Sequence, residues 1–169
     1  MIHAPFEMAE HDDNNPLDLA EDFVQGKGWT YTRDDSDMLV VKMPGQKTNF
    51  DVCMEWQEEF SALLFAVTLP VTISKEQLVS AAKTLDQVNQ NIWLGHFDLS
   101  NRNTHPTFRH TMLLRMIPAG IAVDMIIDLM DIALAECNRF YPTFQMVQAD
   151  DAGLQDNLHA AVFETVGEA

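Results

Sequence analysis

The residues whose types and spacing could form a binding site are His96, Asp98 and Arg109. They lie in two short segments that alternate in polarity as β-strands do and that are separated by a polar turn. A turn centred between Asn103 and Thr104 would place Asp98 directly opposite Arg109 and put all three side chains on one face of a hairpin. An arginine beside a histidine suits a carboxylate or a phosphate, so one interpretation is a pocket for a small anion.

The same residues also have a purely structural interpretation. Asp98 and Arg109 can form a cross-strand charge pair that fixes the register, a contribution of about 0.2–1 kcal/mol. The other face of the hairpin would place Phe97 opposite His110, which is then expected to be a hydrogen-bonded core histidine. No nucleophile, thiol of lowered pKa or paired general acid and base accompanies the cluster, so we predict no catalytic residues there.

The sequence motifs of common catalytic and cofactor sites are missing from the chain. It has no phosphate loop, no G-x-G-x-x-G, no H-E-x-x-H and no G-x-S-x-G, and Gly26-Lys27-Gly28 is typical of a helix stop. Asp124, Asp128 and Asp131 share one face of an expected helix, which is typical of a solvated face rather than of converging metal ligands. We therefore expect no enzyme activity, no bound metal and no cofactor.

Two cysteines and three large aromatic residues remain to be placed. Cys53 and Cys137 lie far apart among apolar neighbours, so both are predicted to be reduced, buried thiols, with a disulfide or a metal pair as the alternative. Trp93 at a helix end and the pair Phe140-Tyr141 are interpreted first as anchors of the core. Their alternative role is in a partner or dimer interface.

Apolar periodicity predicts the elements that must position these residues. Helices are expected to begin at Asn15 and at the capping box 74–77, and a third is expected over 122–141, where Pro142 would end it. An extended segment, 143–148, and a short helix, 151–165, would follow. Strands are expected at 29–33, 38–43, 49–57, 62–71, 96–100 and 107–116.

The order of these elements, α-ββββ-α-ββ-α, indicates an α+β fold in which helices pack on an antiparallel sheet. Residues 1–14 are polar and acidic and lack periodicity, so we expect a mobile acidic tail. The length of 169 residues suits one domain, which we place at 15–169.

The charge balance excludes several classes of partner. The chain has 10 Lys and Arg against 26 Asp and Glu, a formal net charge of −16, and its basic residues are scattered singly. Such a chain repels a phosphate backbone and an anionic membrane surface, so we expect neither nucleic acid nor membrane binding. The most apolar stretch, 117–135, is interrupted by three aspartates, and 1–13 lacks the pattern of a signal peptide, so we expect a cytoplasmic protein.

Several blocks of the sequence resemble the YbjN-type family of small bacterial proteins. They are Asn15-Pro16-Leu17, Trp93-Leu94-Gly95-His96-Phe97-Asp98, Phe108-Arg109-His110, Ala133-Leu134-Ala135-Glu136-Cys137, Arg139-Phe140-Tyr141-Pro142 and Glu164-Thr165-Val166-Gly167-Glu168-Ala169. The family is described as sensory-transduction regulators. Its fold resembles that of type III secretion chaperones, small acidic dimers that hold extended partner segments. The resemblance, which covers about 15–169, implies a similar fold and a homodimer, and it carries over no catalytic residue.

Two hypotheses about function follow. The favoured one is a non-enzymatic binding protein, a sensory-transduction regulator or chaperone-like adaptor, that holds a partner polypeptide segment through apolar surface. The alternative is a sensor of a small anion that uses a pocket of His96, Asp98 and Arg109. The sequence does not name the partner or the signal.

Overall fold

The alternation of apolar and polar residues decides which face of each strand is buried. Along the strand β3 (Asn49–Gln57), the side chains of Phe50, Val52 and Met54 are fully buried, and the residues between them are more exposed. The neighbouring strand β2 (Met38–Pro44) alternates in the same way. One face of the sheet therefore supplies the core, because successive side chains of a strand point to opposite faces.

The structure is a computed structural model that describes residues 15–99 and 104–149. Its element order confirms the α+β fold and the predicted order α-ββββ-α-ββ-α. The remaining elements are α1 (Pro16–Gly26), β1 (Thr30–Asp35), the 3-10 turn η1 (Glu58–Phe60), β4 (Ala62–Thr68), α2 (Leu78–Asn89), β5 (His96–Asp98), β6 (Thr107–Leu113) and α3 (Ala119–Ala149).

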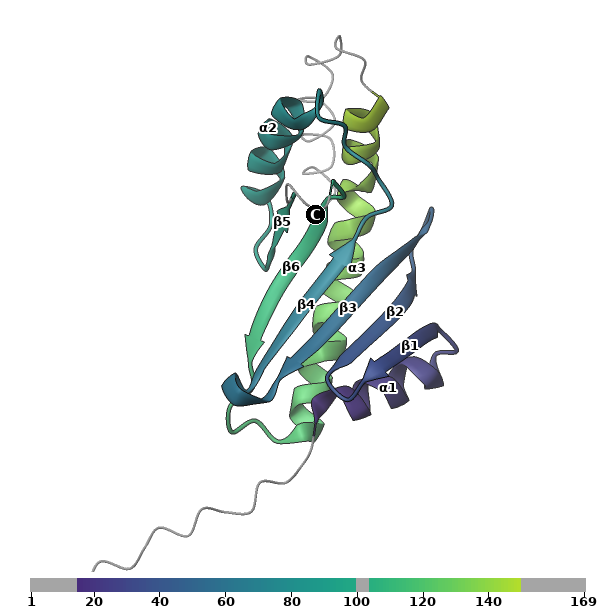
Figure 1. The fold of residues 1–169 in the computed structure, drawn as a ribbon, viewed down its shortest axis with the longest axis vertical. Helices are drawn as coiled ribbons and strands as arrows, with labels where there is room; N and C mark the ends of the chain where they lie inside the picture. The colour runs from purple at the N-terminus through teal and green to yellow at the C-terminus, as the bar shows by residue number, and fades with distance from the viewer. Residues whose placement is uncertain (1–14, 100–103, 150–169) are drawn as a thin grey trace, which may run out of the picture.

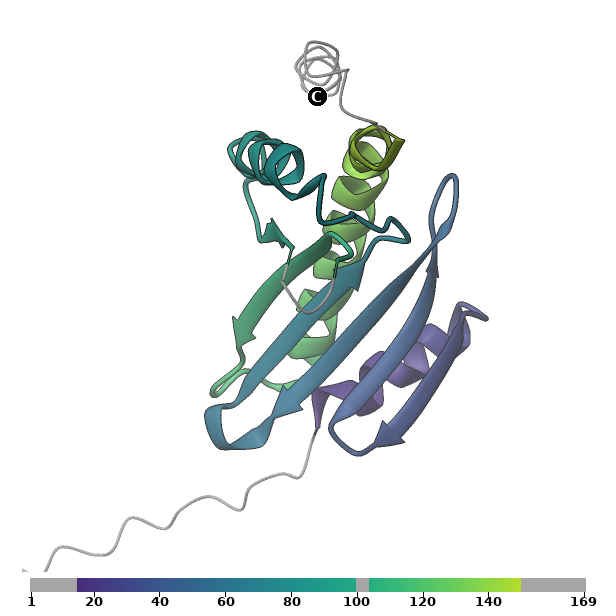
Figure 2. The ribbon, with the colours of Figure 1, turned by 45° about the horizontal axis from the view of Figure 1, so that its top comes forward.

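The six strands form one antiparallel sheet in the order β1-β2-β3-β4-β6-β5. Figures 1 and 2 show that α3 crosses one face of this sheet diagonally. The helix α1 lies on the same face, beside the N-terminal half of α3. The helix α2 lies at the other end of the molecule, next to the C-terminal half of α3. None of the described helices covers the opposite face of the sheet, which carries polar side chains such as Glu55 and Arg109 but also half-buried apolar ones such as Val40 and Leu64.

An aromatic cluster joins the end of the sheet to α3. The ring of Phe97 lies edge-to-face against Phe108 at 5.7 Å and against Phe140 at 6.2 Å between centroids, and 5.3 Å from that of Phe144. All four side chains are almost completely buried. Such contacts add about 0.5–1.5 kcal/mol per pair to the apolar burial, so the cluster holds the short strand β5 against the helix.

The prediction that Pro142 ends the third helix was wrong, as was the extended segment expected at 143–148. The helix α3 continues through Pro142 to Ala149. A proline inside a helix costs about 3 kcal/mol, because it removes one backbone hydrogen bond and crowds the preceding turn. Beyond it, α3 buries Phe144 and Val147 completely, at about 1.5–3 kcal/mol each. Burial of these side chains therefore outweighs the local preference for ending the helix.

The first two helix starts were predicted well, whereas the end of α2, like that of α3, was not. The Asn15 side chain accepts a hydrogen bond from the Leu17 N–H at 3.0 Å and caps α1, as expected. In the predicted capping box, the side chain of Gln77 accepts from the Ser74 N–H at 3.0 Å, and α2 begins one residue later. However, α2 ends at Asn89, four residues before Trp93, which we expected to lie at the helix end.

The link from α2 to β5 depends on two residues. Gly95 has a φ of +73°, and a Cβ added there would lie 2.5 Å from the Phe108 ring, so only glycine fits this position without strain. The Asn89 side chain accepts from the Phe97 N–H at 2.7 Å and donates to the Phe97 carbonyl at 2.9 Å. The Asn89 side chain therefore makes the two backbone hydrogen bonds to Phe97 that a neighbouring strand would otherwise make.

The β5–β6 hairpin forms with a register two residues away from the predicted one. His96, not Asp98, lies opposite Arg109, and Phe97 lies opposite Phe108. The expected pairs of Asp98 with Arg109 and of Phe97 with His110 were therefore wrong as direct cross-strand pairs. A shift of two residues keeps every side chain on its predicted face, because the side-chain period of a strand is two.

Two predicted segments cannot be compared with the structure. The acidic tail of residues 1–14 and the helix expected at 151–165 both lie outside the described residues.

We predict that the ion pair of this hairpin contributes little to stability. The Arg109 Nε donates to the Asp98 Oδ2 at 2.7 Å, and the two side chains are 44% and 32% exposed. Because solvent screens such a pair, a double-mutant cycle of Asp98→Ala and Arg109→Ala, measured by urea unfolding, should give a coupling below about 1 kcal/mol. A much larger coupling would contradict this estimate.

Candidate functional site

The three residues of the predicted anion pocket lie on the uncovered face of the sheet. His96 and Arg109 are direct neighbours across β5 and β6, and Asp98 reaches Arg109 diagonally. The structure thus brings the three together, as the spacing indicated. Their geometry is that of a solvent-facing row in which the Arg109 guanidinium already binds a carboxylate. A small anion at this row would compete with Asp98 for the same cation.

His110 lies on the covered face of the sheet, opposite Phe65 of β4. Burial, reinforced by the nearby His96, holds the pKa of His110 below its usual value. The neutral ring is therefore favoured at physiological pH, which suits a position beside the core. Within the described ranges its ring has no hydrogen-bond partner, unlike the hydrogen-bonded core histidine that we expected.

The three aromatic residues of the alternative interface have different environments. Trp93, between α2 and β5, is 75% exposed. Phe140 and Tyr141 are buried in α3, where Tyr141 packs edge-to-face on Phe50 at 5.8 Å between ring centroids. Trp93 is thus the one of the three that a partner can reach in this structure.

The remaining candidate groups offer little chemistry. Cys53 and Cys137 are unpaired, and burial raises the pKa of both thiols, which disfavours the reactive thiolate. Asp124, Asp128 and Asp131 are exposed along α3, as expected of a solvated face. Across residues 15–99 and 104–149, no three His, Cys, Asp or Glu side chains converge as metal ligands would.

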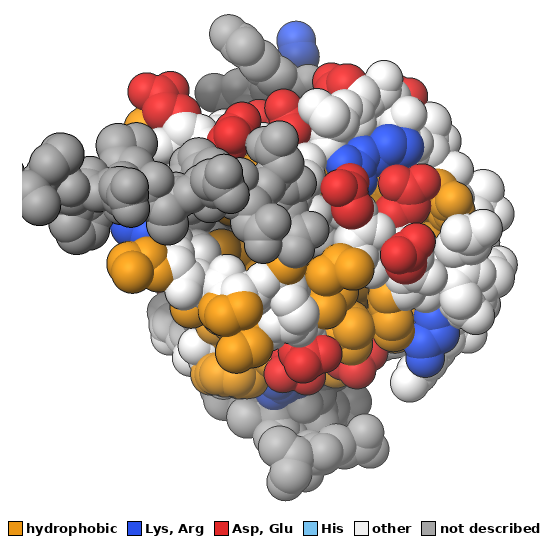
Figure 3. Space-filling view, turned by 90° about the horizontal axis from the view of Figure 1, so that it is seen from below, with side chains coloured by type: hydrophobic (Ala, Val, Ile, Leu, Met, Phe, Trp, Pro, Cys, Tyr) orange, Lys and Arg blue, Asp and Glu red, His pale blue; other side chains and the backbone are white. Residues whose placement is uncertain are grey.

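The most distinctive surface of the molecule was not predicted from the sequence. Several large apolar side chains that the core does not use are exposed at the end of the sheet where η1 and the β6–α3 connection meet, and Figure 3 shows apolar side chains gathered on this end. We call this surface the apolar end. Its members are Phe60 of η1, Leu113 of β6, Met116 and Ile117 of the connection, and Ile121 and Met125 of α3.

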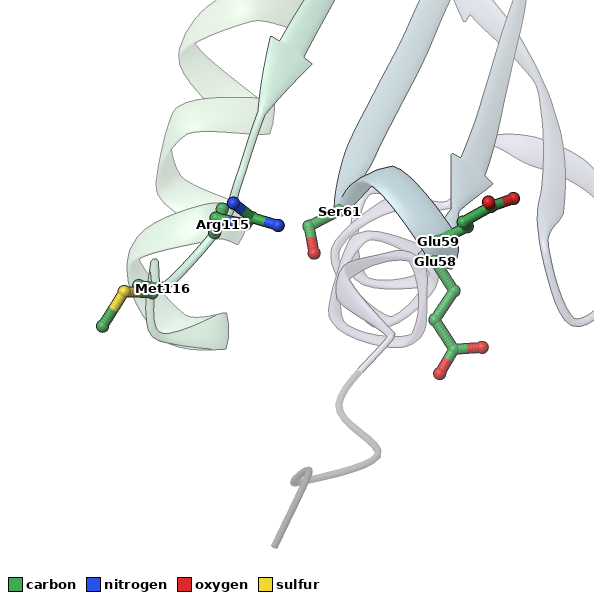
Figure 4. Close-up of a pocket in the computed structure, with 5 residues that line it drawn as sticks. All are labelled: Glu58, Glu59, Ser61, Arg115 and Met116. Carbon is green, nitrogen blue, oxygen red and sulfur yellow. The ribbon is translucent and has the colours of Figure 1, made fainter. Parts of the chain in front are cut away.

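The apolar end is hollowed between its two loops. A hollow of about 780 Å³ is lined by side chains from η1 and from the connection that follows β6. In Figure 4 the Arg115 side chain extends toward the η1 loop, while Met116 points away from it. The lining residues are Glu58, Glu59, Ser61, Arg115 and Met116.

Two residues in left-handed backbone conformations shape this hollow. Ser61, directly after η1, has a φ of +48°, and Met116 has a φ of +60°. The Leu114 N–H donates to the Ser61 carbonyl at 2.7 Å and so ties the two loops together. The left-handed conformation costs a residue with a side chain about 1–2 kcal/mol. Met116 adopts it with a side chain that is 94% exposed.

The charges around the apolar end are mostly negative. Glu58 and Glu59 are exposed on η1, and Asp124 is exposed on α3 between Ile121 and Met125. Among the described residues that line the hollow, Arg115 is the one basic residue. An apolar surface with acidic groups at its margin can bind a partner by burial and select it by charge. The described residues of the apolar end do not include the paired nucleophile and base that a hydrolytic site needs.

No described helix combines the length and the apolar character that crossing a bilayer requires.

Comparisons with known proteins agree with the resemblance seen in the sequence. The model of the YbjN family, described as "Putative bacterial sensory transduction regulator", matches residues 16–146. A comparison with curated proteins finds no match. Among solved structures, the fold is similar to that of YbjN from E. coli, described as a putative transcription regulator. The TM-score is 0.51 at 11% sequence identity, over 73% of this chain and 90% of that one. Because the family model covers most of the described residues, we conclude that the chain belongs to the YbjN family of bacterial regulators.

Proposed function

We propose that the protein is a non-enzymatic regulator that binds a partner polypeptide at the apolar end. The observation that carries this proposal is the distribution of exposed apolar residues. Of the large apolar side chains that are exposed in the described part of the chain, six lie at the apolar end, and the other two are Val79 and Trp93. Scattered apolar residues are normal on a protein surface, whereas a concentration of them is typical of a binding site.

The size of the apolar end suggests a reversible complex. Covering a large, partly exposed apolar side chain contributes about 1–2 kcal/mol, so the six together offer roughly 6–12 kcal/mol. Association costs an estimated 4–15 kcal/mol in lost translational and rotational freedom. The two ranges overlap, so a partner held mainly by this surface would bind and dissociate, as a regulatory contact must.

Family membership and chemistry support a binding role rather than catalysis. The family is described as regulatory. The described residues of the apolar end offer apolar contact and charge, not a nucleophile with its base. A cytoplasmic location and the chaperone-like manner of holding an extended segment, both expected from the sequence, are part of the same proposal.

A second function, sensing of a small anion, is kept because the structure brings His96 and Arg109 together on one face. A ligand would have to displace Asp98 from Arg109, and it would remain open to solvent. Such a site would bind its anion weakly, because exposed ion pairs contribute little. We therefore rank this function below polypeptide binding.

We predict that a partner can be cross-linked at the apolar end in living cells. A photo-reactive phenylalanine analogue at Phe60, which is 59% exposed, should give a discrete higher-mass adduct with a polypeptide. The same analogue at Val79, which is 68% exposed on α2, is the matched control and should give none. Gel electrophoresis and mass spectrometry measure the adduct. Equal labelling at both positions, or none at either, would argue against binding at this surface.

We expect no specific stabilisation by small anions if polypeptide binding is the function. A thermal-shift screen with phosphate and small carboxylates tests the alternative. A sensor would show saturable stabilisation that follows RT ln(1 + [L]/Kd) and disappears in Arg109→Ala. That outcome, together with no cross-link at Phe60, would favour the sensor.

The homodimer that the family resemblance implies is also a prediction. Light scattering of the full chain at micromolar concentration should give about twice its mass of 19.1 kDa. A monomer throughout a dilution series from 100 µM would remove the dimer from the proposal.

A further inference from the structure

We propose that the apolar end recognises a cationic amphipathic segment, in which apolar residues are flanked by Lys or Arg. This inference rests on the proposed function and adds the chemistry of the partner. It follows from the arrangement of charge and apolar surface around the hollow between η1 and the β6–α3 connection, and from the conformation of Met116.

Carboxylates stand on both sides of the apolar surface. Glu58 and Glu59 line the hollow from η1. On α3, Asp124 lies three residues after Ile121 and one before Met125, so the three share one exposed stripe of the helix. A partner that covers the apolar side chains would bring its own flanking groups beside these carboxylates. Cationic flanks gain attraction there, and anionic flanks meet repulsion.

Arg115 balances only part of this charge. It lines the hollow with Glu58 and Glu59. Neither glutamate forms an ion pair within the described residues. Both carboxylates are therefore available to a cation brought by the partner. Charges at the margin of an interface mainly set specificity and the association rate, while apolar contact supplies most of the affinity.

The backbone at Met116 points to an apolar anchor. A left-handed φ favours glycine, yet this position holds a long, unbranched side chain that is 94% exposed. Nothing in the described fold packs on that side chain. Methionine adapts to irregular apolar partners because it is flexible and polarizable. We assign Met116 as a side chain that enters the partner's apolar face.

Two other occupants are less suited to this surface. A second copy related by two-fold symmetry would bring the same carboxylates of both chains into one interface, where they would repel each other. At the hollow, each copy would add Arg115 as its basic residue, which offsets only part of that repulsion. Residues 1–14 of the chain precede α1, which begins at this end of the molecule (Figure 1). They contain four carboxylates and no Lys or Arg, so their charge also matches poorly.

The test uses the full chain and three fluorescent 14-residue peptides with one shared pattern of leucines. Their polar positions are all Lys, all Gln or all Glu, and fluorescence anisotropy gives each Kd. We expect the Lys peptide to bind about 5-fold more tightly than the Gln peptide and the Glu peptide more weakly still, because exposed charge pairs contribute modestly. Raising the salt concentration to about 0.5 M should remove this preference and leave most of the affinity.

Variants assign the effect to the apolar end. Glu58→Gln with Glu59→Gln should bring the Lys and Gln peptides to within about 2-fold of each other. The matched control is Glu76→Gln with Asp86→Asn near α2, which should keep the preference. Met116→Gly should weaken all peptides at least about 5-fold, because apolar contact is lost, and should keep or raise the melting temperature, because strain is relieved. Val79→Ala is its control.

The outcomes separate the two proposals. If all three peptides bind equally and Met116→Gly weakens them, polypeptide binding at the apolar end stands and the cationic preference is overturned. If Met116→Gly leaves every Kd unchanged, both proposals fail at this surface. If Met116→Gly converts a dimer into a monomer, a second copy occupies the apolar end and the inference is overturned.

Discussion

The packing of α3 across the sheet is the constraint on which the rest of the structure depends. Every strand turns apolar or aromatic side chains toward this face, and the aromatic cluster of Phe97, Phe108, Phe140 and Phe144 joins the helix to strands β5 and β6. The helix continues through Pro142 because buried side chains pack it against the core before and after that residue, Phe140 on one side and Phe144 on the other. At 31 residues it is about 46 Å long, so it extends from the apolar end to α2 as one continuous helix.

This arrangement also explains which surfaces remain for a partner. The core buries the alternating apolar side chains of the strands and the apolar side chains of α3 that face the sheet. The side chains at the turn from β6 into α3 project beyond the edge of the sheet, where no described element covers them. The end of the sheet thus carries apolar residues that folding does not use, and acidic residues on both neighbouring elements surround them. The apolar end, where we propose that a partner binds, and the core therefore use separate parts of the same helix.

Much of the fold could be predicted from the sequence, because its elements have clear signals. The sheet was predicted correctly from the alternation of apolar and polar residues along the strands. The starts of two helices were predicted correctly from the Asn15 cap and from the capping box 74–77. The errors have a common cause, because local rules ignore tertiary packing. The helix continues through Pro142 because Phe144 and Val147 are buried beyond it, and β5 is held in place by the Asn89 side chain and by the packing of Phe97 in the aromatic cluster. His96, Asp98 and Arg109 were placed on their correct face.

The apolar end was missed because its residues come from three segments that only folding brings together. Its one local signal was Met116-Ile117, two apolar residues in succession just before Pro118, where a connecting loop is expected to be polar.

The side chain of Asn89 has a consequence for how a partner can bind. Extended peptides often associate with proteins by joining a sheet at its outermost strand, where backbone groups are unsatisfied. Here the amide of Asn89 occupies both the N–H and the carbonyl of Phe97, so the three-residue strand β5 offers no free template at its centre. At the opposite border, β1 carries Arg33, Asp34 and Asp35 and a break in its register beside them, features that discourage another strand. Both edge strands of the sheet are thus protected against the addition of a strand from another chain. The same protection disfavours self-association into fibres by a protein that exposes apolar side chains at one end.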